Sequence, residues 1–182
     1  MVHFRKMHYR RENKGFTLIE LLISLVISGF ILTAIYNILI SNNKIYIRQN
    51  DLVNMEQDLR SAINIMAREI RMAGYSPNAT YNVGLNSTSS SKISFSFYND
   101  SYQNSTTIVY EIYDSSTYGD NTLGRSVNGN KQPIIQNVSN IGFSYDNCKV
   151  VIYLQVSPKH TNLNIPDLNM TKSVFVRNMC LN

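Results

Sequence analysis

The sequence predicts an α+β fold, in which one long N-terminal helix packs on an antiparallel β-sheet formed by the C-terminal half of the chain. Three patterns predict it. Residues 16–40 are a long apolar run, residues 52–73 carry an apolar stripe at helical spacing, and residues 93–176 contain segments in which apolar and polar residues alternate. A helix with one apolar stripe and a sheet with one apolar face bury each other as two layers.

The composition of the 182 residues excludes several classes of protein. Hydrophobic residues make up 43% and charged residues 16%, which excludes wholesale disorder. Two cysteines exclude a disulfide-dense mini-protein and a zinc-finger array. The sequence contains no P-loop, dinucleotide-binding, metalloprotease or nucleophile-elbow motif. We therefore expect no enzymatic activity, no catalytic residue, no metal and no cofactor.

The basic charge is concentrated at the N-terminus. Residues 1–15 contain five Lys and Arg residues and one Glu, so they account for +4 of the net charge of +5. The remaining residues carry a net charge of +1 and lack the basic excess of a nucleic-acid-binding surface. Nucleic acid is therefore a disfavoured partner.

The apolar run at residues 16–40 predicts a membrane-spanning helix. It has 25 residues and one charge, Glu20, whereas a span needs about 18 apolar residues. Its Leu, Ile, Val and Phe residues favour insertion by about 5–10 kcal/mol, which outweighs a cost of at most about 3 kcal/mol for the carboxylate. Because the basic residues precede the run, we expect the N-terminus in the cytoplasm and the residues after 40 outside.

The junction before this run carries a specific motif. Residues 14–20 read K-G-F-T-L-I-E and resemble the type IV prepilin signature at every position. That family comprises type IV pilins and the pseudopilins of type II secretion and competence systems. In it, a membrane peptidase cuts after the glycine and methylates the new N-terminal residue. The resemblance implies a pilin-like fold, cleavage between Gly15 and Phe16, and N-methylation of Phe16. Glycine suits this position because it lets a peptidase approach the backbone closely.

Glu20 has two possible roles. It lies one helical turn after Phe16 on the same face, about 6 Å along the helix axis. An ionised carboxylate is costly at that depth unless it is paired. The resemblance implies that Glu20 pairs with the freed amino group of Phe16 in a neighbouring subunit during filament assembly. The alternative is that its side chain reaches the interface and interacts with the helix dipole.

Residues 41–75 are predicted to form the amphipathic half of the same helix. Apolar residues recur at heptad spacing, interrupted at Glu56, and form one stripe: Leu52, Leu59, Ile63, Met66, Ile70 and Ala73. Gly74 and Pro77 predict the end of a helix spanning residues 17–73, with Gly74 as a left-handed cap. Fewer heptads are present than a coiled coil needs, so we expect the stripe to pack on the C-terminal domain.

The sequence at the end of this helix resembles one subgroup of the family. Residues 66–75 read M-A-R-E-I-R-M-A-G-Y and are similar to the end of the helix in PilW-like minor pilins. The charged residues Arg68, Glu69 and Arg71 need no special role, and we expect them on a solvated face.

The C-terminal half predicts five short antiparallel strands with one apolar face. Alternation occurs near residues 93–97, 108–112, 141–145, 150–156 and 174–176. Polar loops are expected at residues 76–91, 99–106, 114–132 and 158–170. If the last two strands pair so that Ser157 lies opposite Thr171, Cys148 lies opposite Cys180 and a disulfide becomes possible. The alternative is two buried free thiols.

These inferences divide the chain into four parts: a cleaved basic leader at 1–15, a transmembrane and assembly segment at 16–40, an amphipathic helical segment at 41–75, and an exported β-rich region at 76–182. Met1 and Met7 are alternative starts of the leader. The resemblance implies a minor pilin in pilus initiation. It also implies partners: other pilins, the prepilin peptidase and methylase, an inner-membrane assembly platform and lipid.

The resemblance places the chain in the cytoplasmic membrane before assembly and in a pilus or pseudopilus afterwards. Three alternatives remain open: a J-type pseudopilin of a secretion or competence system, an adhesive or DNA-capturing tip subunit, and a tethered domain that never polymerises.

Overall fold

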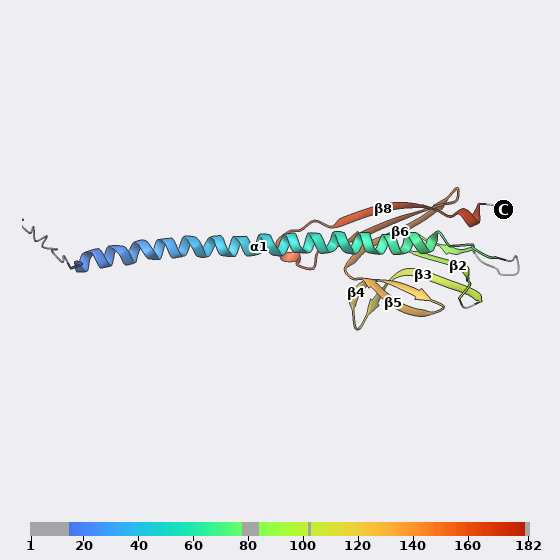
Figure 1. The fold of residues 1–182 in the computed structure, drawn as a ribbon, viewed down its shortest axis with the longest axis horizontal. Helices are drawn as coiled ribbons and strands as arrows, with labels where there is room; N and C mark the ends of the chain where they lie inside the picture. The colour runs from blue at the N-terminus through green and yellow to red at the C-terminus, as the bar shows by residue number, and fades with distance from the viewer. Residues whose placement is uncertain (1–14, 78–83, 102, 181–182) are drawn as a thin grey trace, which may run out of the picture. The chain divides into compact units, whose positions relative to one another are not determined.

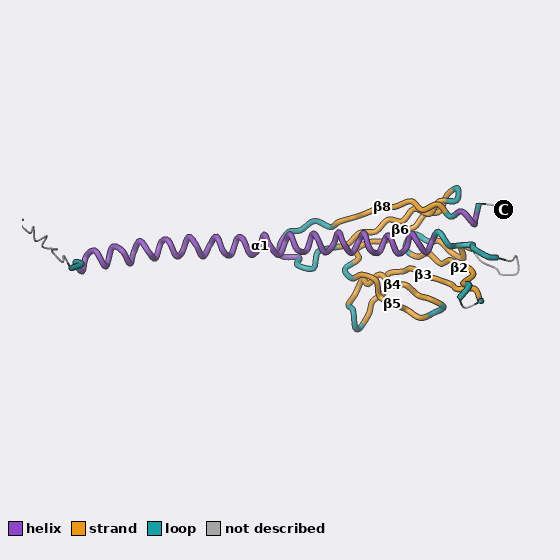
Figure 2. The backbone as a smooth tube through the Cα atoms, in the orientation of Figure 1, coloured by secondary structure: helices purple, strands orange, loops and turns teal. Residues whose placement is uncertain are grey.

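The computed structural model describes residues 15–77, 84–101 and 103–180, so the expected leader at residues 1–14 lies outside the described part (Figures 1 and 2). The chain divides into two compact units, Met1–Ile45 and Tyr46–Asn182. One helix, α1 (Leu18–Ile70), contributes to both units. In the first unit it is the only regular element among the described residues, and in the second it packs on β-sheets.

Helix α1 ends close to the predicted position. The α-helix ends at Ile70, three residues earlier than expected, with a last i→i−4 bond from Arg71 N to Ala67 O at 3.3 Å, and the chain continues in a tighter turn. In that turn Met72 N donates to Glu69 O at 3.0 Å and Ala73 N donates to Ile70 O at 3.1 Å. Gly74 then has a φ of 76°, a conformation that favours glycine, so the predicted left-handed cap is confirmed.

In the described part of the second unit, eight antiparallel strands form two sheets. The five-stranded sheet has the order β1-β2-β3-β4-β5, and the three-stranded sheet has the order β6-β7-β8. Their bounds are β1 Gly84–Thr88, β2 Lys92–Asn99, β3 Asn104–Ser115, β4 Gly119–Val127, β5 Asn130–Ile135, β6 Val138–Asp146, β7 Lys149–Val156 and β8 Leu168–Phe175. Two short 3₁₀ helices, η1 (Thr161–Leu163) and η2 (Arg177–Met179), flank β8.

The α+β class is confirmed, but the predicted sheet was incomplete. The five expected strands correspond to β2, β3, β6, β7 and β8. Strands β1 and β4 and the first half of β5 occupy segments that were expected to be loops, because polar residues and glycine dominate them and obscure the alternation. The strands also form two sheets instead of one.

One apolar cluster joins the helix to both sheets. The predicted stripe is confirmed: Leu59, Ile63, Met66, Ile70 and Ala73 are all buried, whereas Glu56 lies outside the cluster. In Figure 1, β8 lies above the second half of α1, β6 crosses the view of the helix, and β3, β4 and β5 lie below it. The fully buried residues of the sheets include Phe95, Ile108, Tyr110, Leu123, Ile152 and Leu154. The helix is therefore the element on which the two sheets pack.

Gly124 in β4 gives a stability prediction. A Cβ at this position would lie 2.2 Å from a ring carbon of Tyr113 on β3, so the aromatic ring occupies the space above the glycine. Lys131 of β5 makes a cation–π contact with this ring, with its Nζ 5.1 Å from the ring centroid. We expect Gly124→Ala to lower the free energy of unfolding by about 1–3 kcal/mol through overpacking.

The matched test of this prediction is the same change in a Tyr113→Ala background, where the steric conflict is removed and most of the loss should disappear. Urea denaturation of the four variants measures the coupling. Equal losses in the two backgrounds would contradict the role of the ring.

Candidate functional site

The N-terminal end of α1 is organised by a reciprocal pair of hydrogen bonds. Thr17 N donates to Glu20 Oε2 at 2.8 Å, and Glu20 N donates to Thr17 Oγ1 at 3.3 Å. The Thr17 hydroxyl also donates to Glu20 Oε2 at 2.9 Å. This is a capping box, in which the two side chains satisfy N–H groups that a helix start otherwise leaves unpaired. In the single chain, the Glu20 carboxylate therefore stabilises its own helix end.

The two residues of the predicted cleavage point precede this cap. Apart from Gly15 itself and its two chain neighbours, no described residue has an atom within 4 Å of the position that a Cβ on Gly15 would take, and Phe16 is 90% exposed. Both residues lie outside regular structure. An open peptide bond beside a residue without a side chain is accessible to a peptidase. The cleavage, the methylation of Phe16 and the pairing of Glu20 with another chain remain predictions.

The first unit presents an apolar surface that no described residue of that unit covers. Every residue from Phe16 to Ile40 is exposed, and most of these side chains are large and aliphatic. Three of its hydroxyl groups donate to the helix backbone: Ser24 to Leu21 O at 2.9 Å, Ser28 to Ser24 O at 2.7 Å, and Thr33 to Gly29 O at 2.9 Å. These bonds remove polar groups that lipid cannot satisfy. The helix is long and apolar enough to cross a membrane, and it fits membrane anchoring.

The two cysteines form a disulfide, but β7 and β8 pair in a different register from the one that was predicted to bring the cysteines together. Their Cα atoms are 5.7 Å apart. On β8, Thr171 pairs with Tyr153 instead of Ser157, so the predicted register was wrong by four residues. Cys148 lies opposite Val176, whose N–H donates to the Cys148 carbonyl at 2.8 Å. The 3₁₀ turn η2 then returns the chain so that Cys180 reaches Cys148. The oxidation state of the two cysteines in the cell remains a prediction.

The sequence does not reveal the role of Glu69. Instead of lying on a solvated face, its side chain is only 19% exposed and forms a bidentate ion pair with Arg125 of β4, at 2.7–3.0 Å. The hydroxyl of the buried Tyr110 on β3 also donates to Glu69. Burial, followed by the bond to Glu69, raises the pKa of Tyr110, which keeps this phenol protonated. The partners lie 41 and 56 residues away, so no local pattern identifies them.

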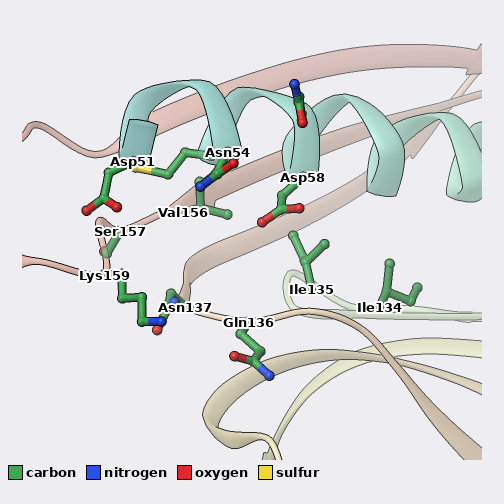
Figure 3. A pocket seen from close by; sticks show the side chains of 12 residues that line it. Asp51, Asn54, Asp58, Ile134, Ile135, Gln136, Asn137, Val156, Ser157 and Lys159 are labelled. Atoms are coloured by element: carbon green, nitrogen blue, oxygen red, sulfur yellow. The ribbon is translucent and has the colours of Figure 1, made fainter. Parts of the chain in front are cut away.

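A cleft of about 390 Å³ lies beside the second half of α1, between the helix and the chain that connects the two sheets (Figure 3). Asp51 and Asp58 line its helix side, and Gln136, Asn137 and Lys159 line the opposite side. Asp51 is held by His160, whose Nδ1 lies 2.8 Å from Asp51 Oδ2.

The described residues contain no group of three His, Cys, Asp or Glu side chains placed to bind a metal ion. The cleft therefore offers hydrogen-bonding groups but no metal-ligand set.

The comparisons with known proteins point to the same end of the chain. Residues 10–36 match the family model described as the prokaryotic N-terminal methylation motif. No curated protein and no solved structure matches the chain. The matched segment contains Gly15, Phe16, the capping box and most of the exposed apolar run. Together with the long helix on antiparallel sheets, the match supports a subunit of the type IV pilin or pseudopilin kind.

Proposed function

We propose that this protein is a minor pilin-like structural subunit of a type IV pilus that acts in pilus initiation. The observation that carries the proposal is the exposed apolar segment of α1 directly after the methylation motif, with Glu20 as its only charged residue. Such a segment is compatible with two environments, lipid before assembly and the apolar helices of other subunits afterwards. The similarity of residues 66–75 to PilW-like minor pilins supports the minor role.

The proposal assigns a task to each part of the chain. The basic leader 1–15 holds the N-terminus in the cytoplasm until the peptidase cuts between Gly15 and Phe16 and Phe16 is methylated. Residues 16–40 anchor the subunit in the cytoplasmic membrane and later join the filament, while residues 41–75 connect them to the exported region 76–182. The partners are other pilins, the peptidase and methylase, and the inner-membrane assembly platform.

The maturation step is tested by the intact mass of the protein isolated from its natural host. We expect a chain that begins at Phe16 and carries one added methyl group. A strain without prepilin peptidase should yield the chain with its leader. Exported protein that retains residues 1–15 would contradict the proposed maturation.

The cellular system is tested by fractionation. We expect the mature chain to co-purify with pili sheared from the cell surface, and its deletion to reduce pilus number. A chain that stays with the envelope, together with loss of protein secretion or of DNA uptake in the deletion strain, would instead favour the J-type pseudopilin alternative.

Glu20→Gln separates the charge of this residue from its capping role. Glutamine keeps the capping box because its side-chain oxygen accepts the same N–H bond, but it carries no charge to pair with an amine. We expect normal cleavage and at least a tenfold loss of incorporation into filaments, on the order of 1.4 kcal/mol or more per subunit contact. Quantitative immunoblotting of sheared filaments and membranes measures the ratio.

The matched control is Thr17→Ala, which removes the two capping-box bonds of the Thr17 hydroxyl and leaves the carboxylate. We expect it to be incorporated nearly as well as the wild type. If the threonine variant is lost from filaments as strongly as Glu20→Gln, helix capping and not charge pairing is the function of Glu20.

A further inference from the structure

A second cavity lies on the five-stranded sheet, where two hairpin ends meet. Its volume is about 590 Å³, within the range of sites for small molecules, and none of its lining residues belongs to α1. The β2–β3 hairpin contributes Asn99 and Asn104, and the β4–β5 hairpin contributes Asn128, Asn130 and Gln132. The site therefore brings five amide side chains together on the rim of one groove.

Three of these asparagines have their side-chain oxygens occupied by the protein's own backbone. The bonds are Ser101 N to Asn99 Oδ1 at 3.0 Å, Ser105 N to Asn104 Oδ1 at 2.7 Å, and Thr107 N to Asn128 Oδ1 at 2.8 Å. A backbone N–H needs an oxygen as its acceptor, so these bonds fix which end of each amide is the oxygen. The amide NH₂ groups are consequently the ends that remain for a ligand.

Gln132 follows the same rule. Its Oε1 accepts from Arg125 Nη1 at 3.3 Å, which again leaves the NH₂ group. Among the residues that the structure describes, none accepts a hydrogen bond from the amide nitrogens of Asn99, Asn104, Asn128 or Gln132. The groove thus offers an excess of donors and suits a ligand rich in acceptors.

The charge balance of the groove favours a neutral ligand. Arg125 lines it, but Glu69 neutralises its guanidinium through the bidentate ion pair. No other charged side chain lines the groove. An anion would therefore lose its hydration without gaining a free positive charge in return. The lining also contains apolar side chains, those of Phe97, Ile108 and Val127.

We propose that this groove binds a neutral glycan that carries N-acetyl groups. Each acetamido group presents a carbonyl acceptor beside a methyl group, which matches amide donors beside an apolar surface. A glycan also has ring and glycosidic oxygens, which accept hydrogen bonds without donating any, whereas a peptide backbone pairs nearly every carbonyl with an N–H donor. This site goes beyond the assembly role, because it gives the exported region a ligand of its own.

The test uses the full mature chain in a zwitterionic detergent without a sugar head group. The probe is tri-N-acetylchitotriose, and maltotriose serves as a sugar of the same length without N-acetyl groups. Equilibrium dialysis should give saturable binding of the acetylated trimer, with a Kd of about 1 mM or tighter, and much weaker binding of maltotriose.

The decisive variant combines Asn104→Asp with Gln132→Glu. Each change keeps the oxygen that accepts the internal hydrogen bond but replaces the NH₂ donor by an acceptor. We expect binding to weaken at least about tenfold, because acceptors would then face acceptors. The control combines Asn140→Asp with Asn169→Asp, two exposed positions on the three-stranded sheet that receive the same charge change. It should bind like the wild type.

Four results would overturn the proposal. They are no saturable binding by the wild type, equal binding of maltotriose, an unchanged Kd in the Asn104→Asp and Gln132→Glu variant, and binding of a neutral acetylated tripeptide amide in place of the sugar. Thermal melting of each variant confirms that the fold is retained before binding is compared.

Discussion

Replacing Glu69 by alanine is expected to lower the free energy of unfolding by about 3 kcal/mol, the lower end of the range for breaking a buried ion pair. The change leaves the Arg125 guanidinium, 23% exposed, and the buried Tyr110 hydroxyl without their shared acceptor. The residual exposure of the pair lets water compensate part of the loss. Urea denaturation of the full chain in detergent measures the change from the midpoint at constant m-value.

The matched control for this prediction is Glu56→Ala, on the same helix. Glu56 pairs with Arg60 at 2.7 Å, but the two side chains are 53% and 63% exposed. An exposed pair of this kind contributes no more than about 0.5 kcal/mol. Equal losses for Glu56→Ala and Glu69→Ala would show that burial of the Glu69 pair has no energetic consequence.

The stability that Tyr110 contributes to the same cluster depends on pH. Because burial and Glu69 raise its pKa in the folded state, the phenol ionises first in the unfolded state, near pH 10. The stability that Tyr110 contributes is therefore complete below about pH 10 and decreases as the pH rises further. The difference in unfolding free energy between the wild type and Tyr110→Phe should shrink between about pH 7 and pH 11. A constant difference would contradict the raised pKa.

The sequence predicts the parts of this fold that follow from local periodicity. The stripe from Leu59 to Ala73 repeats with helical spacing, and alternation in β7 leaves Val150, Ile152 and Leu154 on one face. The hairpin that leads into strand β5 also has a local signal in the sequence. Asn128 and Gly129 both have positive φ, at 49° and 93°, and an Asn-Gly pair of this kind typically forms a tight β-hairpin turn.

Other features have no local signal. The chain passes from one sheet to the other between β5 and β6, where Asn137 has a φ of 57°. The periodicity of the sequence does not predict a change of direction of this kind. The contact between Glu69 and Arg125 depends on how the helix is rotated over the sheet. The groove amides come from two hairpin ends whose proximity follows from strand order. At the N-terminus, by contrast, Gly15, Phe16 and Glu20 are adjacent in sequence, so a motif is sufficient to find them.

Removal of the disulfide between Cys148 and Cys180 is the second large effect. The cysteines are 32 residues apart, and the chain-entropy relation for a loop of that length gives a stabilisation of about 3–4 kcal/mol. We expect the Cys148→Ser and Cys180→Ser double variant to lose this amount in denaturation without reductant. Reductant should bring the wild type to the same stability. Two alkylatable thiols in the folded wild type would contradict the bond.

The backbone conformation at Cys148 allows serine and glycine to be compared at this position in variants that lack the disulfide. Asn147 and Cys148 form the two-residue turn between β6 and β7, and both have positive φ, at 43° and 66°. Glycine is preferred at the second position of such a turn, and a residue with a Cβ costs about 1 kcal/mol there. The disulfide requires a side chain at 148 and so holds a cysteine where the turn alone would favour glycine.

Once Cys180 is serine, that requirement is gone. The Cys148→Gly and Cys180→Ser variant should therefore be about 1 kcal/mol more stable than the variant with serine at both positions. Because both variants lack the bond, the difference reports the turn alone. If glycine gives no gain, the left-handed conformation at 148 depends on the disulfide and relaxes when the bond is lost.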